Sequence, residues 1–112
     1  MAKKSIHVDH WFYSEPDMKP NKDGRRELVA KACFGPLEVY AWGIDLNGRP
    51  YKEYEWIEND FFADENYHIE ISWDELISEI ENMRDFFRER KFYKWAETYE
   101  TVRKELLQLA QK

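Results

Sequence analysis

The stretch YHIEISWDELISEI, residues 67–80, decides the fold because the spacing of its apolar residues changes midway. Residues 67–72 alternate apolar and polar side chains, as in a strand with one buried face. Ser72 and Glu75 then form a capping box, which is a sequence signature of a helix start. From Trp73 onward the apolar residues recur every three or four positions, which is typical of a helix with one buried side. The stretch therefore predicts that strands give way to helices at residue 72.

Two helices are expected on the C-terminal side, over residues 73–88 and about 91–110. Each carries an apolar stripe at helical spacing. The link RERK between them contains no glycine or proline, so one long bent helix is the alternative. We expect a hairpin because both stripes need cover. Trp95 and Leu106 lie on the second stripe and are expected in the core.

Strand patterns fill the N-terminal side of the chain. Runs rich in β-branched and aromatic residues are separated by turn-forming residues. The expected strands cover residues 5–13, 25–34, 37–45, 49–58 and 67–72. Strands followed by helices are the α+β pattern. We therefore expect a single α+β domain over residues 1–112, in which an N-terminal antiparallel sheet of four to five strands is packed by a C-terminal helical hairpin.

The connection DLNGR, residues 45–49, sets the pairing of two central strands. A type I turn followed by a glycine bulge would place Asp45 opposite Arg49 and so pair opposite charges. The same register gathers Tyr40, Trp42, Tyr54 and Trp56 on one face, and Trp11 and Tyr13 of the first strand could join them in an aromatic face. The other face collects small residues, which let helices approach closely, so we expect the helices to cover it. Its residues are Leu28, Ala30, Ala32, Val39 and Ala41.

Length and composition limit the class of protein. A chain of 112 residues is the size of one domain, and five Trp, seven Tyr and seven Phe argue against disorder. The single cysteine, Cys33, cannot form an internal disulfide. No apolar run follows the N-terminal lysines or is long enough to span a bilayer, so we expect no secretory leader and no membrane segment. These features favour a reduced, cytoplasmic setting.

The charge is unevenly distributed along the chain. The net charge is −6, but residues 53–81 contain eleven acidic residues and no lysine or arginine. The remainder of the chain is net positive, and residues 84–94 are distinctly basic. We therefore expect an electrically lopsided molecule.

The stretch SIHVDHWFY, residues 5–13, raises the question of a metal site. On one strand, His7 and His10 point to opposite faces, whereas His7 and Asp9 share a face. An ordinary half-exposed strand is the favoured interpretation, and we expect no metal and no cofactor. The alternative is a small metal- or ligand-dependent enzyme that uses His7, Asp9 and carboxylates. No histidine is placed beside Cys33 by the sequence, so a structural thiol is expected there.

The aromatic face is either core or an exposed platform, and both interpretations remain open. Acidic residues beside it would repel phosphate, so direct binding of nucleic acid is not expected. We expect a non-enzymatic domain that binds a basic protein partner, as an inhibitor or antagonist of the immunity-protein or nucleic-acid-mimic type. The remaining alternative is a homodimeric assembly module that uses the aromatic face. The expected partner-facing residues are Glu53, Glu55, Trp56, Glu58, Asp60, Asp64 and Glu65, with the tryptophan as anchor.

Overall fold

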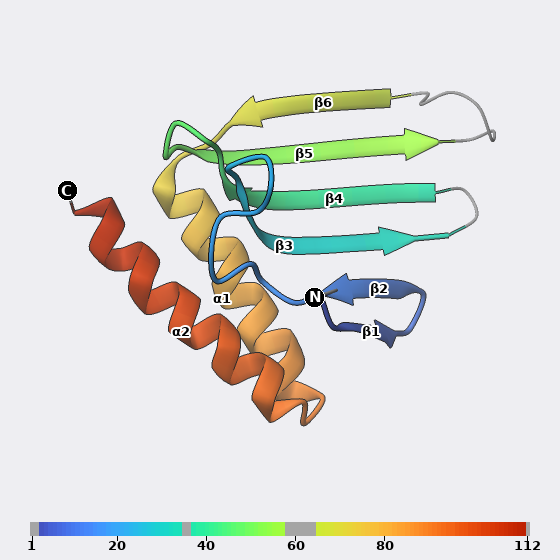
Figure 1. The fold of residues 1–112 in the computed structure, drawn as a ribbon. Helices are drawn as coiled ribbons and strands as arrows, with labels where there is room; N and C mark the ends of the chain where they lie inside the picture. The colour runs from blue at the N-terminus through green and yellow to red at the C-terminus, as the bar shows by residue number, and fades with distance from the viewer. Residues whose placement is uncertain (1–2, 35–36, 58–64, 112) are drawn as a thin grey trace.

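The structure is a computed structural model that describes residues 3–34, 37–57 and 65–111. Within these residues six strands are followed by two helices, which is the predicted α+β fold (Figure 1). The strands are β1 (Ser5–Val8), β2 (Trp11–Ser14), β3 (Arg26–Cys33), β4 (Leu37–Ile44), β5 (Pro50–Ile57) and β6 (Glu65–Glu70). The helices are α1 (Trp73–Glu89) and α2 (Tyr93–Ala110). The strands form one antiparallel sheet, and their order across the sheet follows the chain.

Residues 5–13 form a hairpin and not the single strand that their alternation predicts. β1 pairs with β2 across a turn at Asp9 and His10, so that Val8 lies opposite Trp11. Asp9 adopts a φ of 57°, a left-handed conformation that aspartate tolerates better than most residues. The turn lacks the Asn-Gly or Asp-Gly signal, so alternation alone could not reveal it. This hairpin helps to explain why the sheet has six strands and not four to five.

The turn at residues 45–49 confirms the predicted register. The amide of Asp45 donates to the carbonyl of Arg49 at 2.8 Å, and the amide of Gly48 donates to the carbonyl of Asp45 at 2.9 Å. Gly48 has a φ of 79°, the conformation that a glycine bulge requires. Tyr40, Trp42, Tyr54 and Trp56 therefore lie on one face of the sheet. The small residues of β4 lie on the other face, where Tyr51 of β5 is paired with Gly43.

Both ends of α1 are stabilised by local hydrogen bonds. The Ser72 hydroxyl accepts from the amide of Glu75 at 3.0 Å and caps α1, as predicted. At the other end, the amide of Lys91 donates to the carbonyl of Arg88, and the next amide donates to the carbonyl of Phe87. These two bonds, with Lys91 at a φ of 67°, form a Schellman motif. α1 and α2 are therefore a hairpin and not one bent helix.

The helices pack against the aromatic face of the sheet, and the prediction that they cover the small-residue face is wrong. Tyr13 and Trp42 of the sheet belong to the core. From the helices the core takes Leu76, Ile77, Ile80, Met83, Phe87, Ala96, Tyr99, Val102 and Leu106. Leu106 is fully buried as predicted, whereas Trp95 is only half-buried. Large rings offer much more apolar area than alanines, and burying that area contributes more free energy than a close backbone approach.

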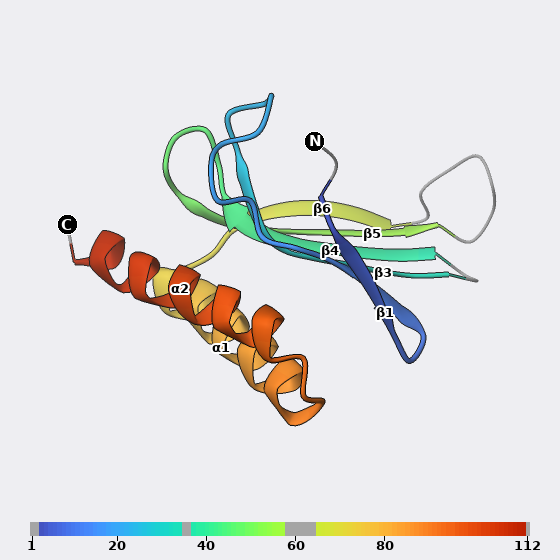
Figure 2. The same ribbon diagram turned by 60° about the horizontal axis from the view of Figure 1, so that its bottom comes forward.

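The helices cover only part of the aromatic face. Figure 2 shows both helices under one end of the sheet, with the opposite strand ends extending beyond them. These strand ends carry residues 31–33, 37–40, 54–57 and 65–67, and we call this region the open end of the sheet. Its position away from the helices leaves side chains of the aromatic face accessible there.

Candidate protein-binding surface at the open end of the sheet

Trp56 occupies a distinctive position at the open end. Across the sheet its neighbours are Glu38 on β4 and Glu65 on β6. Directly opposed residues of adjacent antiparallel strands point to the same face, with Cβ atoms about 4.5–5.5 Å apart. The half-buried indole of Trp56 is therefore flanked by a carboxyl-bearing side chain on each side.

The next row across the sheet consists of tyrosines. Tyr54 lies between Tyr40 and Tyr67, with ring centroids 4.7 and 5.3 Å apart. The hydroxyls of Tyr40 and Tyr54 both donate to Oε1 of Glu38, each at 3.4 Å. Burial raises the pKa of Tyr40 to about 12, so this hydroxyl keeps its proton and remains a donor at neutral pH. The tyrosine row thus orients the Glu38 carboxylate beside Trp56.

The same face already holds two cations of the chain against aromatic rings. The ammonium group of Lys31 lies 5.2, 5.5 and 5.6 Å from the ring centroids of Trp11, Tyr40 and Trp42. That of Lys52 lies 5.4 Å from Trp42. Burial lowers the pKa of Lys31, which reports how far this side chain is withdrawn from water. These distances are within the range of cation–π attraction.

The predicted partner-facing residues do not share one face. Trp56 and Glu65 lie on the aromatic face, whereas the strand alternation places Glu53 and Glu55 on the opposite face. The Glu53 carboxylate is engaged there by Arg25 at 2.7 Å and by His68 at 2.8 Å. Three further predicted residues, Glu58, Asp60 and Asp64, lie outside the described residues.

The sequence interpretation missed Glu38 and Tyr67. Glu38 stands alone among apolar residues of its strand, and it lies outside the acidic segment of residues 53–81. The signal was nevertheless present, because the register that pairs Asp45 with Arg49 also places Glu38 opposite Trp56. Extending that register along the whole hairpin is enough to find the pair.

The histidines have local roles in the structure. The ring of His7 stacks on Phe12 with centroids 4.3 Å apart, and His10 lies in the β1–β2 turn. Asp9 is 3.9 Å from Arg90. Among the described residues, no three His, Cys, Asp or Glu side chains are grouped so that they could hold a metal ion. Cys33 is a half-buried free thiol.

No protein-family model, curated protein or solved structure matches this chain. In the part of the chain that the structure describes, neither helix has the length and apolar character needed to cross a bilayer. The function of the chain must therefore be inferred from the geometry and chemistry of its own residues.

Proposed function

We propose that this chain is a protein-binding domain that docks on a basic protein through the open end of its sheet, with Trp56 as the anchor. The observation that carries the proposal is the cross-strand row in which Trp56 lies between Glu38 and Glu65. An arginine or lysine stacked on the indole would meet a carboxylate on either side. Such a site combines cation–π attraction with charge-assisted hydrogen bonds.

The behaviour of the chain's own lysines supports a cationic ligand for this face. Lys31 and Lys52 already lie over aromatic rings next to the Trp56 row. The tyrosine hydroxyls that orient Glu38 restrict its carboxylate before any partner arrives. A restricted side chain loses less conformational entropy on binding, so the free energy of the new contacts is better preserved.

The charge of the chain suits a partner with a strongly basic surface, such as a protein that itself binds nucleic acid. A net charge of −6 and eleven acidic residues between positions 53 and 81 would accelerate encounter with such a surface. By covering that surface the domain would act as an antagonist or inhibitor. We place this activity in a reduced, cytoplasmic setting because the single cysteine is a free thiol.

The proposal is tested by capturing the partner from cells and measuring its binding kinetics with purified variants. Trp56→Ala should raise the dissociation rate by about 30-fold, the equivalent of about 2 kcal/mol for an anchor residue. The double variant Glu38→Gln/Glu65→Gln should lower the association rate and weaken its dependence on salt. Glu55→Gln is the matched control, because it removes one charge from the opposite face of the same strand.

Two outcomes would contradict the proposal. Binding that is equally sensitive to Glu55→Gln and to the Glu38→Gln/Glu65→Gln pair would show that general acidity, and not the Trp56 row, recognises the partner. A chain that sediments as a dimer, and reverts to a monomer on Trp56→Ala, would show that the aromatic face binds a second copy of itself. Melting temperatures of all variants must stay near that of the wild type for either comparison to hold.

A further inference from the structure

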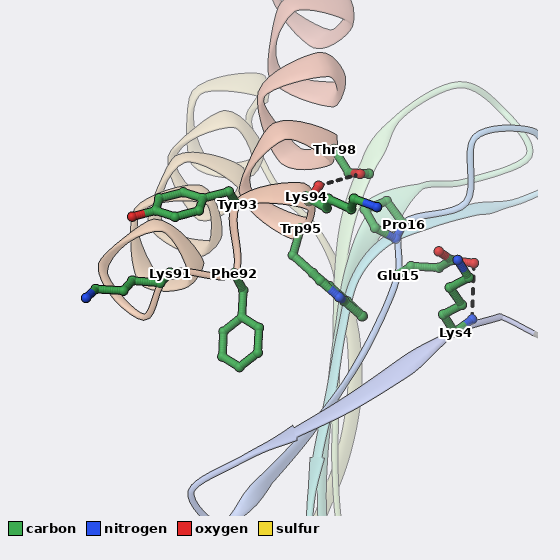
Figure 3. A pocket seen from close by; sticks show the side chains of 9 residues that line it. All are labelled: Lys4, Glu15, Pro16, Lys91, Phe92, Tyr93, Lys94, Trp95 and Thr98. Carbon is green, nitrogen blue, oxygen red and sulfur yellow. Dashed lines mark hydrogen bonds between the residues drawn. The ribbon is translucent and has the colours of Figure 1, made fainter.

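A second surface lies beside α2, away from the open end of the sheet. Two adjoining cavities, of about 480 and 540 Å³, share Lys4, Glu15, Pro16 and Thr98 and so form one continuous groove. One wall is the segment that follows β2, and the other is the first turns of α2. Figure 3 shows Lys94 extending from α2 toward Pro16 and Trp95 extending below it, with Lys4 and Glu15 on the far side.

The groove is basic although the protein is acidic. Five lysines and two carboxylates line its two parts. Asp17 is neutralised by Lys3 at 3.2 Å, and its other oxygen accepts from the amide of Glu27. Within the described residues, the structure has no salt bridge to the ammonium groups of Lys4, Lys19 or Lys94. A net positive groove thus persists on a chain whose net charge is −6.

The groove also offers apolar surface between its charges. Phe92 and Trp95 are half-buried and line one part, and Pro16 is buried and lines both. Met18 lines the second part and is 50% exposed. The ring of Trp95 is fixed on its inner side by Phe87, with centroids 5.2 Å apart, so its outer edge is a rigid contact surface.

We propose that this groove binds a short acidic peptide segment of a partner protein, with an aromatic or aliphatic side chain of the peptide packed on Trp95 and Pro16. The lysines would pair with the carboxylates of the peptide, while the apolar floor selects a segment that is not uniformly charged. The partner differs in charge from the basic protein expected at the open end, so the two surfaces would join an acidic and a basic partner.

The dimensions of the groove favour a peptide of about four residues. The lining residues of α2 run from position 93 to position 101, a rise of about 12 Å at 1.5 Å per residue. An extended peptide covers that distance with about four residues at 3.3 Å each.

The extent of the basic surface favours a short acidic peptide over a nucleic acid. Among the described residues that line the groove every cation is a lysine, which pairs with carboxylate and phosphate alike as a point charge. A nucleic acid would also extend beyond the groove and meet the acidic remainder of the chain. A short peptide feels mainly the local lysines, because charges separated by more than about 8 Å are largely screened at physiological ionic strength.

The test uses the full chain and three fluorescently labelled probes in an anisotropy titration. The first is the acidic pentapeptide Asp-Glu-Phe-Asp-Glu with blocked ends, and the second is its amide counterpart Asn-Gln-Phe-Asn-Gln. The third is pentathymidylate, whose four phosphates match the four carboxylates of the first probe. We expect binding of the acidic peptide alone, and weakening by about tenfold in Lys4→Glu/Lys94→Glu, the equivalent of about 1.4 kcal/mol.

The matched control is Lys22→Glu/Lys104→Glu, which makes the same charge change at exposed lysines outside the groove. It should change the affinity by less than about twofold, since screened distant charges contribute little. The proposal is overturned if the acidic peptide does not bind, if the amide peptide binds equally well, or if both double variants weaken binding alike. Tighter binding of pentathymidylate would assign the groove to nucleic acid instead. Self-association lost only in Lys4→Glu/Lys94→Glu would assign it to the acidic segment of a second copy.

Discussion

Arg26 of β3 and Glu105 of α2 form a two-pronged ion pair, in which two guanidinium nitrogens donate to the two carboxylate oxygens at 2.7 and 2.9 Å. The third guanidinium donor, Nε, bonds the carbonyl of Asp17 at 3.1 Å. The Arg26 side chain is only 11% exposed. One arginine therefore joins the sheet, the segment after β2 and the last helix, and it fixes one wall of the groove beside α2.

Removing this carboxylate should destabilise the fold in a pH-dependent way. Glu105→Gln leaves the nearly buried Arg26 without its charged partner and should cost about 1–3 kcal/mol at pH 7. The hydrogen bonds from Arg26 lower the pKa of Glu105, so its contribution is fully present above the ordinary value of about 4.3 and is lost as pH falls through the lowered value. Urea unfolding at pH 7 and pH 3 checks this: the difference between variant and wild type should shrink at pH 3, and a constant difference would contradict it.

Alanine substitutions on α2 should distinguish its buried side from its exposed side by their effect on stability. Leu106→Ala removes a fully buried side chain and should cost about 2–5 kcal/mol. Leu107→Ala is the control, since the neighbouring leucine is 36% exposed and its loss should stay within about 0.5 kcal/mol. The measurement is chemical unfolding of both variants. Equal losses would mean that the buried side of α2 has been assigned wrongly.

Replacing Tyr99 with phenylalanine should raise the free energy of unfolding. Its ring is fully buried and stacks on Phe87, but its hydroxyl has no hydrogen-bond partner among the described residues. A buried polar group without a partner is costly, so Tyr99→Phe should stabilise the protein by about 1 kcal/mol. Tyr40→Phe provides the contrast, because that hydroxyl donates to Glu38 and its loss should not stabilise. A melting temperature that falls in Tyr99→Phe would indicate an unseen hydrogen-bond partner.

A glycine at position 91, in the turn between the helices, should stabilise the protein. Lys91 holds a φ of 67° at the position of the Schellman motif where glycine is usual. Lys91→Gly removes the strain of a side chain in the left-handed region and should stabilise by about 0.5–1 kcal/mol. Lys94→Gly, in the first turn of α2, should instead destabilise by a similar amount, about 0.5–1 kcal/mol. Denaturant midpoints of the two variants should therefore move in opposite directions.

Local chemistry made much of the fold predictable. The capping box at Ser72 and the glycine bulge at Gly48 each depend on a few neighbouring residues, and both are present as predicted. The register that follows from Gly48 even contains the pairing of Trp56 with Glu38. The hairpin at Asp9 was not predicted because Asp-His lacks the glycine of the usual two-residue hairpin turns, and the tolerance of aspartate for a left-handed conformation is too weak a signal by itself.

The features that could not be predicted depend on distant parts of the chain. Which face the helices cover is decided by the total apolar area on each side of the sheet, and alternation within a strand does not report that total. The engagement of Glu53 likewise depends on Arg25, which directly precedes β3 and contacts the Glu53 carboxylate on β5. A run of acidic residues says nothing about which of them such a distant cation will neutralise.

The chain-order topology of the sheet has a consequence for synthesis on the ribosome. Each strand pairs with the strand made just before it, so the sheet can assemble while translation continues. The helices that cover Tyr13 and Trp42 emerge last. Until α1 is released, the nascent chain must carry these rings uncovered, because Tyr13 packs on Phe86 and Phe87 of that helix. A message truncated before α1 would therefore yield a sheet-bearing fragment prone to aggregation and proteolysis.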